Sequence, residues 1–376
     1  YSLCDFCRML SAVTSTCRSV VELPGRDVKK VKALISSEGL KPVRLHSQGA
    51  DFLKETHFLR RGDPAQKEGV APQSFLQVLM SAPMDKSWKQ TPPKGARTTF
   101  RRASFASWIT DVEKGAGHLL ARVIVNRIWQ HHLGRGLVAT PNDFGIRGEK
   151  PTHPELLDWL AQQLIKHEWR LKPIHRMILS SAVYAQSSEL SSSRKCDPEN
   201  RLFWRRPVKR LEAEVIRDSL LSLGDELDLR MYGKGTLDSR SRRRSIYFTV
   251  KRSKLIPMLQ IFDAPDGLTS LGERPRTTVA PQALYLMNNP QVRQSALGLA
   301  RRMKSDSSLS LEESVTRGYE LVLTRKPTSE EHRRSLAFVR RQQESYLKQN
   351  RGNAQELALR DFAQVLMCLN EVIYLD

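Results

Sequence analysis

The sequence predicts a mainly α fold: a helical domain with a minor β hairpin or small sheet. Apolar residues recur at helical spacing along most of the chain after residue 104, and capping or stop residues flank these stretches. Only residues 244–250, RSIYFTV, alternate as a strand does, with Ile246, Phe248 and Val250 on one face. The 376 residues, 40% of them hydrophobic, are enough to bury a large core and to form more than one packing unit.

The predicted helices begin near residue 119. The first carries apolar side chains between residues 119 and 128 and stops at Gly134 and Gly136. A capping box of Thr152 and Glu155 starts the second, Pro173 opens the third, and the fourth runs from about 207 to 223. The remaining predicted helices span roughly 280–304, 311–323, 328–349 and 354–371.

Composition predicts three parts along the chain. Residues 1–57 have weak periodicity and form the tail of a preceding domain or an irregular segment. Residues 58–103 form an extended segment followed by a linker rich in Pro, Lys, Thr and Gly. Residues 104–376 form the helical domain, with a split into two subdomains near 225–275 as one arrangement.

The chain is strongly basic. Its 61 Lys and Arg residues against 40 Asp and Glu give a formal net charge of +21, which favours anionic partners such as nucleic acid, acidic glycan or lipid headgroups. A solubility role for the same charge is the alternative. No run of ~18 apolar residues exists, so we expect no membrane span. The start at Tyr1, without an initiator Met, leads us to expect the cut end of a longer polypeptide.

The spacing of the five cysteines does not indicate a cofactor site. Cys4 and Cys7 form a C-x-x-C pair, but Arg8 stands where c-type haem attachment requires a histidine. No second ligand pair at zinc spacing accompanies them or Cys17. We therefore expect no cofactor in this chain, and unpaired or disulfide-bonded cysteines rather than a metal site.

Polar residues gather in the first predicted helix and the loop after it. One helical turn separates Asn126 from Gln130 and Arg127 from His131, so each pair shares a face. A histidine, a carboxylate and an arginine close together suit general acid and base catalysis with an anion clamp. The predicted catalytic residues are Arg127, His131, Asp143 and His153, and the predicted ligand-binding residues are Asn126, Gln130, Arg135 and Glu155. A structural polar network that joins the two helices is the alternative interpretation.

A second loop, Phe262–Gly267, holds the only weak candidates for metal binding. Asp263 and Asp266 lie three residues apart between Pro and Gly, but the alternating oxygen ligands of a calcium loop are absent. An ion pair of an aspartate with Arg274 or Arg276 is the simpler expectation. We therefore predict no metal site.

Several motifs together resemble a known family. They include ARVIVNRIWQHHLGRG from Ala121, DPENRLFWRRPVKRLEAEVIRDSLL from Asp197, MLQIFDAPD from Met258 and TTVAPQALYLMNNPQV from Thr277. This pattern resembles the planctomycete-type C-terminal domain of unknown function of secreted multidomain proteins that also carry a cytochrome-like domain. The resemblance covers about residues 57–376 and departs at VEKGAGHLLARV and at LDLRMYGKG.

The resemblance implies an extracytoplasmic protein, at the periplasm or cell surface, whose partners are the upstream domains of its own polypeptide. Any haem would lie in an upstream domain. Together with the charge, it leads us to expect a binding or assembly unit with a basic surface for anionic polysaccharide. The alternatives are a novel hydrolase or redox-linked enzyme acting on polysaccharide, with a pocket around Arg127, His131, Asp143 and His153, and a nucleic-acid-binding protein. Nucleic acid is disfavoured because interleaved aromatic platforms are scarce.

Overall fold

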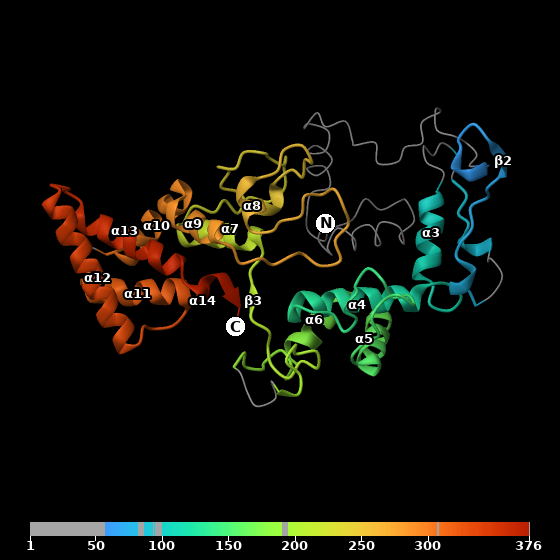
Figure 1. The fold of residues 1–376 in the computed structure, drawn as a ribbon, viewed down its shortest axis with the longest axis horizontal. Helices are drawn as coiled ribbons and strands as arrows, with labels where there is room; N and C mark the ends of the chain where they lie inside the picture. Colours follow the sequence, from blue (N-terminus) through green and yellow to red (C-terminus); the bar gives the residue numbers. More distant parts are fainter. Residues whose placement is uncertain are drawn as a thin grey trace. The chain divides into compact units, whose positions relative to one another are not determined.

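The computed structural model describes residues 57–81, 86–92, 94, 100–189, 195–306 and 308–375. In this part the chain is mainly α, as predicted (Figure 1). Its sheets are two small antiparallel pairs: β1 (His57–Leu59) with β2 (Lys67–Val70), and β3 (Lys209–Arg210) with β4 (Tyr374–Leu375). The predictions on Cys4, Cys7 and Cys17, on the N-terminal tail and on part of the linker lie outside the described residues.

The chain divides into two compact units. Among the described residues, the first comprises those within 57–130 and 153–177, and the second comprises those within 131–152 and 178–375. Because residues 131–152 belong to the second unit, each unit consists of two segments that are separated in the sequence.

The first unit contains the β1–β2 hairpin and a set of helices. These are α3 (Arg101–Thr110), α4 (Gly117–Leu133) as far as Gln130, α5 (Pro154–Lys166) and α6 (Leu171–Leu179) as far as Met177. A small aromatic cluster holds α3 in place: the ring of Phe75 stacks on Trp108 with 5.3 Å between centroids and meets the edge of Trp88 at 5.7 Å. The Trp88 indole N–H donates to Asp111 at 2.8 Å, so its one polar group is satisfied within the cluster.

Two predictions about helix ends have different outcomes. Helix α4 ends at Leu133 and Gly134 follows with φ +84°, as the glycine signal predicted. The capping box of Thr152 and Glu155 is wrong. His153 is the N-cap of α5 and makes no side-chain cap bond, while the Thr152 hydroxyl donates to the carbonyl of Leu137 at 3.3 Å. The Thr152 hydroxyl therefore bonds to a carbonyl of the preceding loop and does not cap α5.

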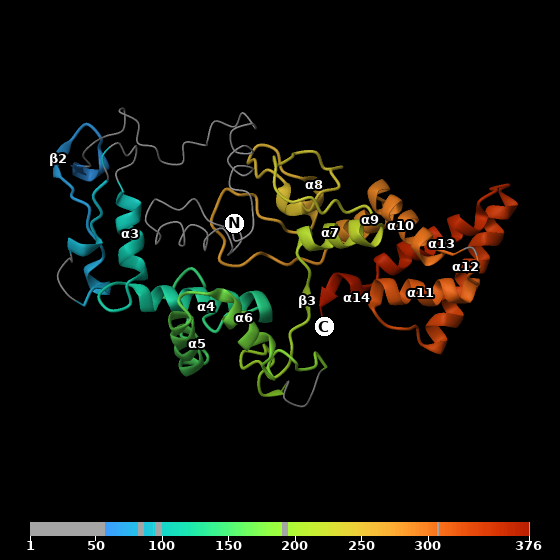
Figure 2. The same cartoon turned by 180° about the vertical axis from the view of Figure 1, so that it is seen from behind.

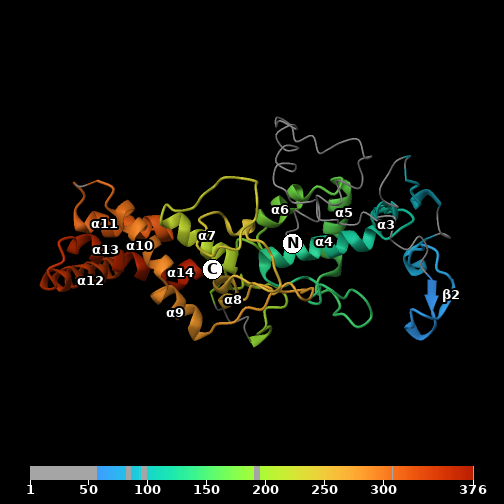
Figure 3. The same ribbon diagram turned by 90° about the horizontal axis from the view of Figure 1, so that it is seen from above.

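The second unit ends in a helical bundle. Its helices are α7 (Ala213–Leu223), α8 (Pro257–Ile261), α9 (Ala280–Asn288), α10 (Pro290–Met303), α11 (Leu311–Leu323), α12 (Ser329–Lys348), α13 (Ala354–Met367) and α14 (Asn370–Ile373). Helices α10 to α13 lie side by side in the three views of Figures 1, 2 and 3. Leu299, Met303, Val315, Leu359 and Phe362 are buried at their centre.

The predicted helix over 280–304 is two helices. Pro290 cannot donate an amide to the turn before it, and the Asn289 side chain accepts the amide of Gln291 at 2.8 Å, which caps α10. The predicted helix over 354–371 also breaks, into α13 and α14.

Residues 244–250 do not form the predicted strand. Ser245–Tyr247 form a 3-10 helix, and Phe248 makes only an isolated bridge to Thr236. At the start of this segment, the carboxylate of Asp218 on α7 accepts the Ser245 amide at 2.8 Å and the Ser245 hydroxyl at 2.7 Å. A side chain therefore takes the amide that a neighbouring strand would otherwise bind.

A close contact between two glycines sets the end of α7 on α10. A Cβ added to Gly298 would lie 2.1 Å from the carbonyl oxygen of Gly224, which is closer than atoms can approach. Arg302 fixes the same contact, because it donates to the carbonyls of Ser222 at 3.0 Å and Leu223 at 2.7 Å. The orphan carbonyls of the α7 C-terminus thus find a cationic donor.

We predict that Gly298→Ala lowers the free energy of unfolding by about 1–3 kcal/mol, because the added methyl forces the two helices apart. This loss would outweigh the helix propensity that alanine brings. Gly352→Ala is the control, since a Cβ there meets nothing within 4 Å, and we expect a change within about 0.5 kcal/mol. Urea unfolding followed by circular dichroism measures both; equal stability of the two variants would contradict the contact.

Candidate functional site

The predicted polar residues of α4 differ in exposure. Asn126 and Gln130 are buried, at 0% and 6% exposure, and lie one turn apart. Arg127 is half-buried and His131, in the last turn, is exposed. The buried pair therefore faces the interior of the fold.

The loop after α4 contains two more predicted residues. Asp143 is exposed and its carboxylate accepts the amide of Gly145 at 2.8 Å, which is a turn contact. Arg135 is half-buried and lies 3.4 Å from Glu149 and 3.9 Å from Glu199. At the start of α5, His153 is half-buried and Glu155 is exposed.

The two compact units divide these residues. Asn126, Arg127, Gln130, His153 and Glu155 belong to the first unit, and His131, Arg135 and Asp143 belong to the second. Convergence of Arg127, His131, Asp143 and His153 on one pocket therefore stays a prediction. So does the alternative of a structural polar network.

Cations from distant segments hold the end of α4 and its loop. Lys209 donates to the carbonyl of His131 at 2.7 Å, and Arg276 donates to the carbonyl of Gly134 at 3.3 Å. Burial lowers the pKa of Lys209, and the charge of Arg276 lowers it further. Both cations lie at the C-terminus of a helix, where positive charge is favourable.

The two aspartates considered for metal binding are already engaged. Asp263 accepts from Arg210 at 2.5 Å and from the amide and hydroxyl of Thr277 at 2.8 and 2.9 Å. Asp266 accepts the amide of Leu268 at 2.8 Å. Within the described ranges, no group of three or more His, Cys, Asp or Glu side chains could hold a metal ion.

An arginine does brace this loop, but it is Arg210. Its side chain is 5% exposed, it lies in β3, and it also donates to the carbonyl of Phe262. Of the two expected arginines, Arg274 binds Glu214 at 2.7 Å and Arg276 lies 3.4 Å from Glu273. Spacing along the sequence could not reveal Arg210, because 53 residues separate it from its partner.

We predict that Asp263→Asn lowers the free energy of unfolding by about 3 kcal/mol, because it leaves the buried Arg210 without a countercharge. Asparagine tolerates the positive φ of residue 263 (+64°), so the backbone conformation is retained. Asp266→Asn in the same loop should change stability by less than about 0.5 kcal/mol, since its contact is an exposed turn. Chemical denaturation compares them, and a smaller loss at 263 than at 266 would refute the brace.

The segment between α7 and α8, residues 226–256, is the most basic stretch of the second unit and is called the basic segment below. It lies beside α8 in Figure 1. Against Glu226, Asp228 and Asp238 it carries nine cations: Arg230, Lys234, Arg240, Arg242, Arg243, Arg244, Lys251, Arg252 and Lys254.

Two arginines hold the backbone of the basic segment. Arg217 of α7, 4% exposed, donates to the carbonyls of Ser241 and Arg243, and its guanidinium lies 4.6 Å from the ring centre of Phe248. Arg243 donates to the carbonyls of Lys234 at 3.0 Å and of Tyr232, and stacks 3.7 Å over the ring of Tyr247. Loops with little regular structure are thus fixed by side chains.

Other cations of the basic segment remain exposed. Arg230 and Arg242 pair with Asp228 and Glu226 at 2.6 and 3.1 Å, and Arg240 lies 3.8 Å from Asp238. Five exposed cations make no ion pair with any described residue: Lys234, Arg244, Lys251, Arg252 and Lys254. Exposed apolar side chains accompany them, namely Leu229, Met231, Tyr232, Ile246 and Val250.

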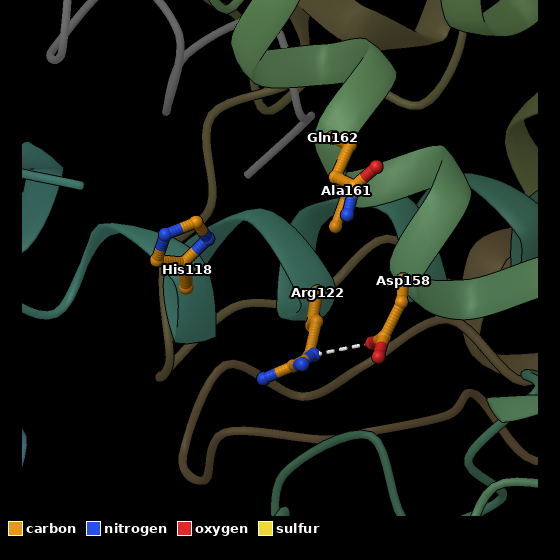
Figure 4. Close-up of a pocket in the computed structure, with 5 residues that line it drawn as sticks. All are labelled: His118, Arg122, Asp158, Ala161 and Gln162. Atoms are coloured by element: carbon orange, nitrogen blue, oxygen red, sulfur yellow. Dashed lines mark hydrogen bonds and ion pairs between the residues drawn. The ribbon is translucent and has the colours of Figure 1, made fainter. Parts of the chain in front are cut away.

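The first unit contains a small pocket that sequence analysis missed. It has a volume of about 360 Å³ and is lined by residues of α4 and α5: His118, Arg122, Asp158, Ala161 and Gln162 (Figure 4). Arg122 Nε donates to Asp158 at 2.6 Å, and this bond lowers the pKa of the Asp158 carboxyl. The only sequence signal is helical spacing, because His118 and Arg122, and likewise Asp158 and Gln162, lie four residues apart.

A mainly α chain of two compact units thus carries a basic segment and a small arginine-lined pocket. The pattern of the PSD1 family, described as "Protein of unknown function (DUF1553)", matches residues 101–339, so the chain belongs to this family. In the comparisons with curated proteins and with solved structures, nothing matches the chain. No helix in the described ranges is long and apolar enough to cross a membrane.

Proposed function

We propose that this chain is a binding module that holds anionic polysaccharide on the basic segment. The observation that supports this most directly is the group of five exposed cations that make no ion pair with any described residue. In a fold where many arginines pair with carboxylates, cations without such a partner are available to an external anion. Clustered charge of one sign raises the local concentration of an oppositely charged polymer.

The conformation of the basic segment favours binding. Arg217 and Arg243 hold its backbone before any ligand arrives, so less conformational entropy is lost on association. Exposed Tyr232, Ile246 and Val250 offer apolar surface beside the charges. Sugar rings carry both charged substituents and apolar C–H faces, and this combination matches a surface that presents both kinds of group.

The setting of this function comes from the family resemblance in the motifs. We propose that the chain works outside the cytoplasm, at the periplasm or cell surface, as a C-terminal part of a planctomycete-type polypeptide with a cytochrome-like upstream domain. Polysaccharide is the anionic polymer that such a location favours over nucleic acid.

We predict salt-sensitive binding to a heparin-like sulfated polysaccharide and none to a neutral dextran. Replacing Arg244, Lys251, Arg252 and Lys254 together by Gln should weaken heparin binding roughly tenfold or more at low salt, since each exposed ion pair contributes about 0.2–1 kcal/mol. Raising the salt concentration should narrow this difference, because counterions screen exposed charges. Fluorescence titration of the full chain at two salt concentrations measures both effects.

The control replaces four other exposed cations by Gln: Lys326, Arg341, Lys348 and Arg351. Both variants lose the same formal charge. If the basic segment is the binding site, only its fourfold variant should bind heparin much more weakly. Equal losses in the two variants would mean that only the total charge matters. Equal affinity for dextran, absence of a salt response, or tighter binding of a DNA duplex than of heparin would refute the proposal.

A further inference from the structure

We infer that the pocket between α4 and α5 binds the carboxylate of a small organic acid, with Arg122 as the group that recognises it. This site belongs to the first unit and is independent of the function proposed for the basic segment. Three features of the pocket favour such a ligand: the unused edge of a guanidinium, the fixed charge beside it, and the size of the cavity.

Arg122 has donors to spare. Asp158 accepts only its Nε, at 2.6 Å, and the two terminal amino groups make no hydrogen bond with any described residue. Figure 4 shows the rest of the guanidinium extending away from Asp158, on the side where His118 lies. Two parallel N–H groups in one plane match the two oxygens of a carboxylate, and such bidentate bonds are both strong and directional.

Asp158 has two effects on what can bind. It fixes the guanidinium by holding Nε, so the free edge has a defined direction before a ligand arrives. Asp158 also places a negative charge beside the site, and the Asp158 side chain is 46% exposed. A ligand with one negative charge gains from Arg122, whereas a phosphate with a second charge near Asp158 is repelled.

The cavity suits a small molecule. Its volume of about 360 Å³ lies at the lower end of the range of roughly 300–1,000 Å³ for ligand pockets. Ala161, which is 4% exposed, lines the cavity with a short apolar side chain, so this side chain leaves the space open for a ligand. His118 and Gln162 add hydrogen-bonding groups. A hydroxylated carboxylic acid, either free or as a uronate at the end of a glycan, has the groups that this lining can bind.

The test uses glucuronate, acetate, glucose and inorganic phosphate as probes, titrated into the full chain by isothermal calorimetry. We expect glucuronate to bind and glucose and phosphate not to bind. Acetate separates the contribution of the carboxylate from that of the hydroxyl groups. If acetate binds as tightly as glucuronate, the carboxylate alone is recognised; if acetate binds more weakly, the hydroxyl groups also contribute. Arg122→Gln should weaken glucuronate at least tenfold, and Arg122→Lys should restore only part of this loss.

Two further variants keep the inference testable if Arg122→Gln does not fold. Asp158→Asn removes the repulsion and should allow phosphate to bind, a gain that a damaged fold cannot produce. Lys166→Gln, an exposed change at the end of α5 and outside the pocket lining, should leave glucuronate binding unchanged. Glucose binding equal to that of glucuronate, or an unchanged affinity in a folded Arg122→Gln, would overturn the inference.

The fourfold variant of the basic segment separates this site from the proposed function. It should bind glucuronate as the parent does, because all five pocket residues belong to the first unit. Loss of heparin binding with retained glucuronate binding would support two independent sites. Loss of glucuronate binding in that variant would instead contradict an independent pocket.

Discussion

Two buried guanidinium groups hold irregular backbone in the second unit, where neither helix nor sheet does so. Arg217 binds the carbonyls of the basic segment, and Arg210 binds the loop after α8. Backbone carbonyls inside a fold need a donor, and the described part of this chain has only four short strands to supply one through sheet pairing. An arginine offers five donors in a planar fork, so one side chain can replace several backbone pairings.

This constraint changes how the net charge of +21 is interpreted. Part of the positive charge is engaged in contacts with the protein's own backbone: Lys209 and Arg276 donate to carbonyls at the end of α4, and Arg302 donates to carbonyls at the end of α7. Such residues add to the formal charge without offering it to a partner. The charge available for the proposed binding is the smaller set that is exposed and makes no ion pair with a described carboxylate, which includes Lys251 and Arg252.

The sequence predicted what depends on local signals. The helix over 311–323 has the predicted bounds, because a Ser310 capping box and an amphipathic stripe fix it locally. The strand predicted over 244–250 is instead a 3-10 helix over Ser245–Tyr247 with one isolated bridge at Phe248, and the Ser245 amide bonds to Asp218, which is distant in sequence. Long-range side-chain contacts also created the Arg210 brace and the Arg122 pocket, and periodicity contains no information about which distant residues meet.

Arginine therefore has two opposite roles within the same part of the chain, and the burial of its guanidinium decides which role a given arginine has. Arg217 is desolvated and must keep its carbonyl partners, so neither lysine nor an apolar residue can replace its fork. Arg244 is exposed and supplies only charge, a role that lysine also fills. Weaker anion binding after a change at Arg217 would therefore report disorder of the basic segment, whereas the same loss after a change at Arg244 would report a lost contact. Only exposed positions can identify what the surface binds.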